Sequence, residues 1–131
     1  MNLNTELLSA LEKIVGASYL FTDEATRKIY GHDETEDLSF PPNVVLKPAN
    51  TLEVAEILKV ANLHKIPVVP IGARTGLSGG ALSIYGGIGI SMERFNKIIE
   101  IDEQNLQVTT EPGVITQVLR EAVAEKGLLY P

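Results

Sequence analysis

The sequence contains no cysteine and has only 2 histidines among its 131 residues. Without cysteine, neither disulfides nor thiolate chemistry is available, and the redox compartment is left open. His32 and His64 are isolated and accompany no nucleophile-elbow motif, so no Ser–His–Asp set can be built on them. His64 lies near the end of an expected helix, where the helix dipole explains it. We therefore predict no catalytic residue in this chain.

Positive charge is also scarce, with 11 Lys and Arg against 17 Asp and Glu, giving a formal net charge of -6. Nucleic acids and anionic lipids both require clustered cations, so neither is expected as a partner. No run of about 18 apolar residues is present, so we predict no membrane span. The leucine-rich N-terminus contains Glu6 and Glu12 and does not resemble a signal peptide. We expect a cytoplasmic protein.

Hydrophobic periodicity predicts an α+β fold with a small parallel or mixed sheet and flanking helices. Strand, helix and strand within about 30 residues form a βαβ unit, which predicts parallel strands. Thr5 is expected to cap the first helix, and Asn50 or Thr51 the second, with Glu53 completing a capping box. The expected helices are 5–15, 50–64 and 116–126, and the expected strands are 44–47, 66–71, 88–91, 97–101 and 106–111.

The expected buried stripe of the second helix comprises Val54, Ile57, Leu58 and Ala61, which follow helical spacing. The first helix has a similar stripe, and the third should bury three residues. The expected buried residues of the first helix are Leu7, Leu8, Leu11, Ile14 and Val15. Those of the third helix are Val118, Leu119 and Ala122.

Composition divides the chain into an N-terminal helical extension, 1–43, and a body, 44–131. Residues 17–43 are polar and irregular, and they end at Pro41–Pro42, which forces an extended backbone. The acidic cluster within them lacks the spacing of a calcium loop, so we predict a solvated charge run and no metal site. The chain ends on an apolar stretch, which leads us to expect a piece of a longer protein. The cluster comprises Asp33, Glu34, Glu36 and Asp37.

A glycine-rich stretch is the strongest functional signal. Seven of the 11 glycines lie between Gly72 and Gly89, and Arg74 is the only charged residue between Ile66 and Ser91. Glycines allow left-handed backbone and close approach of a ligand, so that several N–H groups can point at one anion. One arginine can add a bidentate contact. The stretch 70–81 (PIGARTGLSGGA) is therefore predicted to hold a phosphate group.

The spacing excludes two common phosphate cradles. A P-loop requires Lys and then Ser or Thr after its last glycine, and the dinucleotide fingerprint requires G-x-G-x-x-G. Neither is present, because Gly72, Gly76 and Gly79 are separated by four and then three positions. No helix is expected after the loop, so loop amides alone must hold the anion. From composition alone, glycines that only form a turn and a bulge remain equally compatible.

The stretch 68–81 (VVPIGARTGLSGGA) resembles the flavin-binding segment of FAD-linked oxidases with the vanillyl-alcohol oxidase or para-cresol methylhydroxylase type of flavin domain. The similarity to glycolate oxidase D-subunits and D-lactate dehydrogenases extends over about residues 30–131. It implies that the chain is the first, incomplete lobe of such a domain, without the substrate-binding part. Residues implied to contact FAD are Ile71, Gly72, Ala73, Arg74, Thr75, Gly76, Gly79, Gly80 and Ala81.

Two positions in this segment depart from parts of the family. Some relatives have a histidine at the position of Thr75 and link it covalently to the flavin, so the resemblance implies a non-covalent FAD here. Arg74 replaces a small residue, and either a role in neutralising phosphate or a solvent-facing position is compatible with the sequence. Pro112–Gly113 is a weaker candidate, because the family places this turn near the ligand and a plain strand-to-helix turn explains it equally well.

The resemblance implies a flavin-dependent oxidoreductase that converts a small 2-hydroxy acid, such as glycolate or D-lactate, to the 2-oxo acid. The present chain by itself is expected to be inactive. Other oxidase subunits are possible partners, and the fragment could form a homo-oligomer through its uncovered apolar surface. The alternatives are a non-catalytic nucleotide- or phosphate-binding module and a structural fragment whose glycines only make turns.

Overall fold

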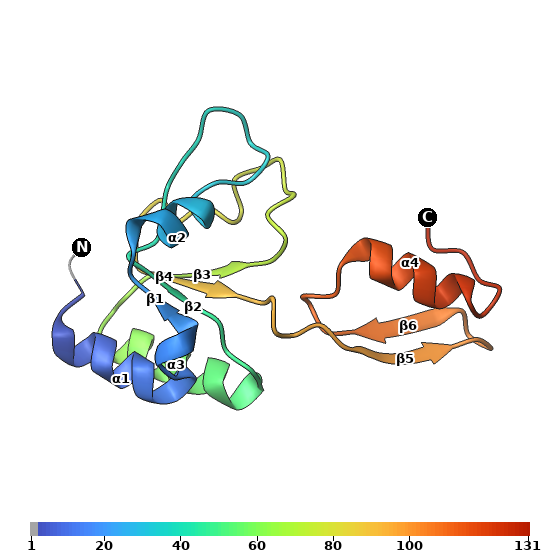
Figure 1. The fold of residues 1–131 in the computed structure, drawn as a ribbon, viewed down its shortest axis with the longest axis horizontal. Coiled ribbons are helices and arrows are strands. Elements are labelled where there is room, and N and C mark those ends of the chain that lie inside the picture. Colours follow the sequence, from blue (N-terminus) through green and yellow to red (C-terminus); the bar gives the residue numbers. More distant parts are fainter. Residues whose placement is uncertain (1–2) are drawn as a thin grey trace. The chain divides into compact units, whose positions relative to one another are not determined.

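The computed structural model describes residues 3–131, which form two compact units divided after Arg94. We call residues up to Arg94 the N-terminal unit and residues 95–131 the C-terminal unit. Figure 1 shows a sheet with helices on both faces in the N-terminal unit, and a hairpin with one helix in the C-terminal unit. The predicted α+β class is confirmed, with a small mixed sheet and flanking helices.

The sheet of the N-terminal unit has four strands in the order β1-β2-β4-β3. Strands β2 and β3 both run parallel to β4, so the predicted parallel βαβ unit is confirmed, with β4 inserted between its two strands. The short β1 pairs antiparallel with β2. The elements are α1 (Thr5–Val15), the 3-10 helix η1 (Ala17–Tyr19), β1 (Leu20–Phe21), α2 (Glu24–Ile29), β2 (Val44–Leu46), α3 (Thr51–Leu63), β3 (Val68–Ile71) and β4 (Ile88–Ser91).

Alternate residues of β2 face opposite sides of the sheet, as the pleat of a strand requires. Val44 and Leu46 pack with residues of α1 and α3 in the larger hydrophobic cluster. Val45 lies on the other face, in a smaller cluster with Tyr30 and Ile71. Because both faces are covered, β2 is buried along its whole length, which is typical of parallel strands between helices.

Local capping explains where the two longer helices begin. The side chain of Asn4 accepts a hydrogen bond from the Leu7 amide at 2.8 Å, so Asn4 caps α1 and the predicted cap at Thr5 is wrong. Asn50, one of the two predicted caps, caps α3 by accepting from the Glu53 amide at 3.0 Å. The Glu53 carboxylate accepts from the amide of residue 49 at 2.7 Å, one residue before the cap. Both caps satisfy amides that the first helical turn leaves free.

The buried stripe of α3 is narrower than predicted. Ile57 and Ala61 are buried, and Val54 is partly buried, but Leu58 is 46% exposed. A helix on the outside of a sheet buries only the residues that point directly at it, and Leu58 lies at the edge of that stripe. The prediction for Leu58 is therefore wrong.

Residues 17–43 are more ordered than predicted, because they contain η1, β1 and α2. Helix α2 begins after Asp23, whose carboxylate accepts from the Thr26 amide at 2.8 Å. Strand β1 joins the sheet, and Tyr30 after α2 is only 4% exposed. The prediction that this stretch is irregular is wrong. Its elements were missed because a six-residue helix and a two-residue strand are too short for a periodic signal. The division into an extension, 1–43, and a FAD-binding lobe, 44–131, stays a prediction.

The C-terminal unit is a hairpin and one helix: β5 (Ile98–Asp102), β6 (Gln107–Thr110) and α4 (Thr116–Ala124). The predicted hairpin is confirmed, with antiparallel strands and an irregularity in register. Leu119 and Val123 are the buried residues of α4, whereas Val118, predicted to lie inside, is 50% exposed. Among the described residues, no helix is long and apolar enough to cross a membrane.

Candidate functional site: the glycine-rich loop

The glycine-rich segment joins β3 to β4 and leaves the sheet at the carboxyl end of β3. The neighbouring parallel strands β2 and β4 lead at their own carboxyl ends to Lys47 and Glu93. In open α/β sheets, ligands bind outside the carboxyl ends of the strands. The topology therefore places the predicted loop at the edge of the sheet where a ligand site is expected.

The glycines nearest β4 are required by the fold itself. Gly87 has φ +83°, and a Cβ added there would lie 2.2 Å from the backbone oxygen of Pro67. At Gly86, an added Cβ would lie 2.4 Å from the side chain of Asn43, which also accepts from the Gly87 amide at 2.6 Å. At these positions glycine serves packing and a left-handed backbone.

The glycines in the body of the loop are different. Gly72, Gly76 and Gly80 do not have positive φ, so their backbone does not require glycine. A Cβ added at Gly72 or Gly80 would meet nothing within 4 Å, and at Gly76 only a carboxylate oxygen of Asp33, at 3.9 Å. All three are exposed. The chain's own packing thus gives no reason for glycine at these positions, and at Gly72 and Gly80 the missing side chain leaves open space beside the backbone.

Arg74 occupies the left-handed region, with φ +60°, which is uncommon for a residue with a side chain. Its guanidinium donates to the backbone oxygen of Ile29 and lies 5.0 Å from the centre of the Tyr30 ring. The side chain is thus directed toward the end of α2. Thr75, the next residue, is exposed.

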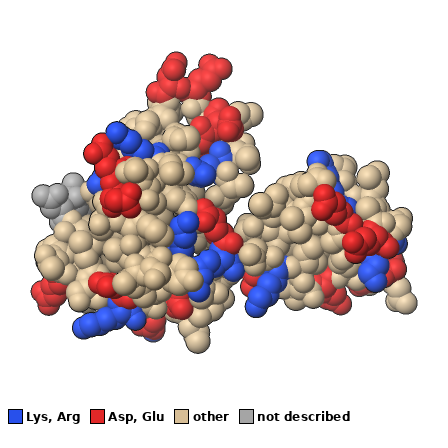
Figure 2. Space-filling view, viewed as in Figure 1, with Lys and Arg blue, Asp and Glu red and all other residues tan. Residues whose placement is uncertain are grey.

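The acidic segment after α2 lies beside the loop. Asp33 is only 8% exposed, so the prediction of a fully solvated run is wrong for this residue, while Glu34, Glu36 and Asp37 are exposed. Figure 2 shows acidic side chains gathered at that end of the N-terminal unit. The amide of Glu34 donates to the Gly76 oxygen at 3.0 Å. Burial of Asp33 follows from this contact between two loops, which sequence spacing does not reveal.

Hydrogen bonds hold Asp33 in its ionised form. One carboxylate oxygen accepts from the Thr35 amide at 3.0 Å. Bonds from the Thr35 amide and hydroxyl lower the pKa of Asp33, and the Ala81 amide contributes, against the smaller effect of burial. The second carboxylate oxygen is buried without a hydrogen-bond partner. A negative charge therefore lies beside Gly76 and is stabilised mainly by Thr35, which is compatible with shaping the loop.

A second network lies at the carboxyl ends of β2 and β4. Lys47 and Glu93 form an ion pair at 2.8 Å, and the Tyr30 hydroxyl also donates to Glu93. Partial burial favours the neutral form of Glu93, but the bonds from Lys47 and Tyr30 outweigh it and lower its pKa. Burial likewise opposes the charge on Lys47, and Glu93 and Tyr30 reverse this and raise its pKa. The Lys47 ammonium lies 5.2 Å from the centre of the Tyr30 ring.

The other candidates form no cluster of functional side chains. His32 and His64 are both exposed, and His64 is the C-terminal cap residue of α3. Pro112–Gly113 precedes α4 in the C-terminal unit, where the Gly113 amide donates to the Phe95 oxygen at 2.7 Å. Within residues 3–131, no group of three or more His, Cys, Asp or Glu side chains could hold a metal ion.

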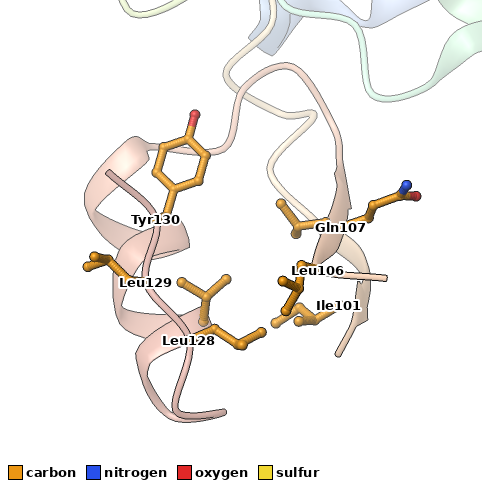
Figure 3. Close-up of a pocket in the computed structure, with 8 residues that line it drawn as sticks. Ile101, Leu106, Gln107, Leu128, Leu129 and Tyr130 are labelled. Carbon is orange, nitrogen blue, oxygen red and sulfur yellow. The ribbon is translucent and has the colours of Figure 1, made fainter. Parts of the chain in front are cut away.

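The C-terminal unit contains an apolar cavity of about 190 Å³ between its hairpin and the segment after α4. Figure 3 shows Ile101, Leu106 and Leu128 converging on it, while the Gln107 amide and the Tyr130 hydroxyl point away. Its lining contains no charged residue, and it offers no donors suited to an anion. The remaining lining residues are Val108, Val123 and Leu129.

Comparison with protein families places this loop in a known context. Residues 42–131 match the FAD binding domain family, a match that includes all nine predicted contact residues. The chain belongs to this family. FAD is therefore its cofactor, and the predicted family resemblance is confirmed.

Individual relatives agree with this assignment. The chain is 39% identical over 121 residues to glycolate oxidase subunit GlcD of Bacillus subtilis, covering 92% of this chain and 26% of that protein. It is also 39% identical over 127 residues to the D-lactate dehydrogenase of Anaerostipes hadrus, covering 96% of this chain and 26% of that protein. The chain thus spans about a quarter of the length of these two relatives, which are named as a glycolate oxidase subunit and a D-lactate dehydrogenase.

Solved structures share the fold. The 4-ethylphenol oxidase of Gulosibacter chungangensis superposes with a TM-score of 0.80 at 28% identity, covering 96% of this chain and 26% of that one. A p-cresol methylhydroxylase superposes with a TM-score of 0.81 at 23% identity, over 94% of this chain and 25% of that one, and supports the fold alone.

The loop fits such a cofactor on its own geometry. A diphosphate needs several N–H donors at short range and a backbone that it can approach closely. The open space at Gly72 and Gly80 permits that approach.

The sequence did not predict the contacts between the loop and residues 29–35, because nothing in the spacing pairs these two segments. The signal for α2 was present in Asp23, an N-cap residue before Glu24.

Proposed function

We propose that residues 71–81 hold the diphosphate of FAD through backbone amides. The observation that carries this proposal is the open space at Gly72 and Gly80, where neither φ nor packing requires glycine. A Cβ at these positions would occupy the space that a phosphate oxygen needs to reach an amide. The proposed contact residues are Ile71, Gly72, Ala73, Arg74, Thr75, Gly76, Gly79, Gly80 and Ala81.

We further propose that the flavin is held non-covalently. Thr75 stands where covalent relatives place a histidine, and a threonine hydroxyl lacks the nucleophilic nitrogen needed for such a link. The two histidines of the chain lie elsewhere, at positions 32 and 64. Acid precipitation of the FAD-loaded protein should leave all flavin in the supernatant, and flavin absorbance in the pellet would contradict a non-covalent site.

In the complete enzyme, this chain would supply binding and orientation. FAD, when bound, provides the electron acceptor for oxidation of a small 2-hydroxy acid to a 2-oxo acid. The glycolate oxidase and D-lactate dehydrogenase relatives support this substrate class. The glycolate oxidase relative is named as a subunit, which supports partner subunits in the full assembly. We also propose a cytoplasmic location. Self-association of the chain through exposed apolar side chains is a further proposal.

The test compares FAD binding by the chain with binding by two loop variants. FAD should raise the melting temperature of the wild-type chain by mass action and lose fluorescence on binding. Gly72→Ala and Gly80→Ala should bind FAD about tenfold more weakly, because each Cβ intrudes on the phosphate. Both should melt like wild type without FAD, since the added atom meets nothing. Ala55→Ser, on the exposed face of α3, is the control of matched size.

The same titrations separate the alternatives. Equal stabilisation by FAD, ATP and pyrophosphate would favour a general phosphate-binding module without flavin chemistry. No stabilisation by any of the three would favour glycines that only shape turns. Unchanged FAD affinity in both glycine variants would contradict the loop as the phosphate site, even if the chain binds FAD.

A further inference from the structure

One end of the glycine loop is attached to the end of α2. Arg74 donates from its guanidinium to the Ile29 oxygen and stacks on the Tyr30 ring at 5.0 Å. A left-handed residue with a side chain costs about 1 kcal/mol or more, and the contacts of Arg74 with Ile29 and Tyr30 offset that cost. The backbone conformation at Arg74 is thus maintained from outside the loop.

The middle of the loop is attached to the acidic segment. The Glu34 amide donates to the Gly76 oxygen at 3.0 Å, and the Gly79 amide donates to the Thr35 hydroxyl oxygen at 2.9 Å. Asp33 orients this segment by accepting from the Thr35 amide at 3.0 Å. One backbone oxygen and one backbone N–H of the loop are therefore held by residues more than 40 positions earlier.

The attachment point is itself rigid. Tyr30 is 4% exposed and its hydroxyl donates to Glu93, which is paired with Lys47. Lys47 follows β2 and Glu93 follows β4, so the ring is tied to two central strands of the sheet. Arg74 therefore stacks on a surface that is fixed to the core.

We propose that residues 29–35 form a clamp that holds the glycine loop in its FAD-binding shape, with Thr35 as its central positioning residue. This inference rests on the proposed function of the loop. The clamp lies before residue 42, where the match to the FAD binding domain family begins. The N-terminal segment thus acts on the cofactor site without contacting the cofactor.

A clamp on the loop would strengthen FAD binding because glycine residues make the free loop flexible. A loop with glycines at 72, 76, 79 and 80 loses more backbone entropy on ordering than a loop of the same length without glycine. If the loop is ordered before FAD arrives, that cost is not taken from the binding free energy. Because the Gly79 N–H donates to Thr35, Gly79 would contact FAD through other backbone atoms, and the phosphate donors are other amides of the loop.

The charge of Asp33 agrees with a positioning role. Its carboxylate lies beside Gly76, where direct contact with a diphosphate would be repulsive. Its free oxygen is buried and not accessible to a ligand. Asp33 therefore stabilises the turn through Thr35 and is not itself a contact of the anion.

The experiment uses a pair of substitutions at one position. Thr35→Val keeps the size and branching of the side chain but removes the oxygen that accepts from Gly79, whereas Thr35→Ser keeps that oxygen. NMR order parameters of residues 72–81 report the loop without FAD, and a titration reports its affinity. We expect Thr35→Val to lower the loop order parameters from rigid toward flexible values and to weaken FAD binding about fivefold. Thr35→Ser should restore both.

Amide exchange in β2 and β4 controls for loss of the fold. It should be unchanged in Thr35→Val, since Thr35 lies outside the hydrophobic clusters. Wild-type order parameters and affinity in Thr35→Val would overturn the clamp. If exchange in β2 and β4 rose equally in the valine and serine variants, the role of Thr35 would be general stability, which also overturns it.

The result separates the clamp from the proposed function. If Gly72→Ala weakens FAD binding and Thr35→Val does not, the loop binds FAD and the clamp is wrong. If neither wild type nor variants bind FAD, the proposed function fails for this chain, and the order parameters still decide whether residues 29–35 hold the loop.

Discussion

The two units differ in how much of their sequence they bury. The N-terminal unit has a four-stranded sheet with a hydrophobic cluster on each face, and side chains such as Leu46 and Ile57 are fully buried. The C-terminal unit has a two-stranded hairpin and one helix, and its few buried residues include Leu119 and Val123. Two strands alone are marginal in water, so this unit depends on α4 for its core. The candidate site accordingly stands on the better-packed unit.

The largest expected effect tests that difference directly. Leu46→Ala should lower the free energy of unfolding of the N-terminal unit by about 3–4 kcal/mol, because it empties a fully buried position between the sheet and two helices. Leu119→Ala, at a position 8% exposed on one helix, should cost the C-terminal unit about 2 kcal/mol. Denaturant unfolding, monitored by amide exchange in each unit, measures the loss of stability in both variants. Equal costs would contradict the contrast in packing.

The second prediction contrasts glycines within the N-terminal unit. Gly87→Ala should cost about 3 kcal/mol, because the added Cβ meets the Pro67 backbone oxygen and φ is positive. Gly72→Ala should change the free energy of unfolding by no more than about 0.5 kcal/mol, since its Cβ meets open space. Thermal melts of the two variants without FAD provide the measurement. Comparable losses would mean that Gly72 also serves the fold.

The third prediction concerns the helix caps of the two units. Asn50→Ala should lower stability by about 1 kcal/mol, because the Glu53 amide loses its acceptor. Helix α4 has Ile115 at its N-cap, 64% exposed and without a side-chain cap, so Ile115→Asp should stabilise the C-terminal unit by about 1 kcal/mol. Ile115→Leu is the control. Failure of the new cap to raise the melting temperature would mean that another interaction fixes the start of α4.

The smallest expected effect is on the acid limb of stability. The pKa of Glu93 is lowered in the fold, so its contribution is present at neutral pH and is lost as pH falls below the ordinary value of 4.5. Glu93→Gln should therefore be less stable than wild type at pH 7, and the difference should shrink toward pH 3. The pKa of Asp102, the last residue of β5 in the other unit, is also lowered, first by the Asn105 side chain. Asp102→Asn should show the same pH dependence with a smaller loss of stability at pH 7. A larger loss in Asp102→Asn than in Glu93→Gln would contradict the importance of the Glu93 network.

Much of the fold followed from local patterns. Helix α3 was predicted with its cap at Asn50 or Thr51, and the hairpin of β5 and β6 was predicted from its turn, because both signals lie within a few residues. Helix α2 was missed, although Asp23 marks its start, because six residues are too few for a periodic stripe. Leu58 and Val118 were placed inside wrongly, since helical spacing shows which residues share a face but not how wide the contact is.

The sequence by itself determined the class of the domain and the position of its glycine loop, because periodicity and glycine spacing are local properties. Only the tertiary structure distinguished two kinds of glycine: Gly87, which packs against another backbone, and Gly72, which meets open space. It alone brought Thr35 to the Gly79 amide, 44 residues away in the sequence. Such contacts depend on how separate segments cross in space, and no pattern within either segment records that.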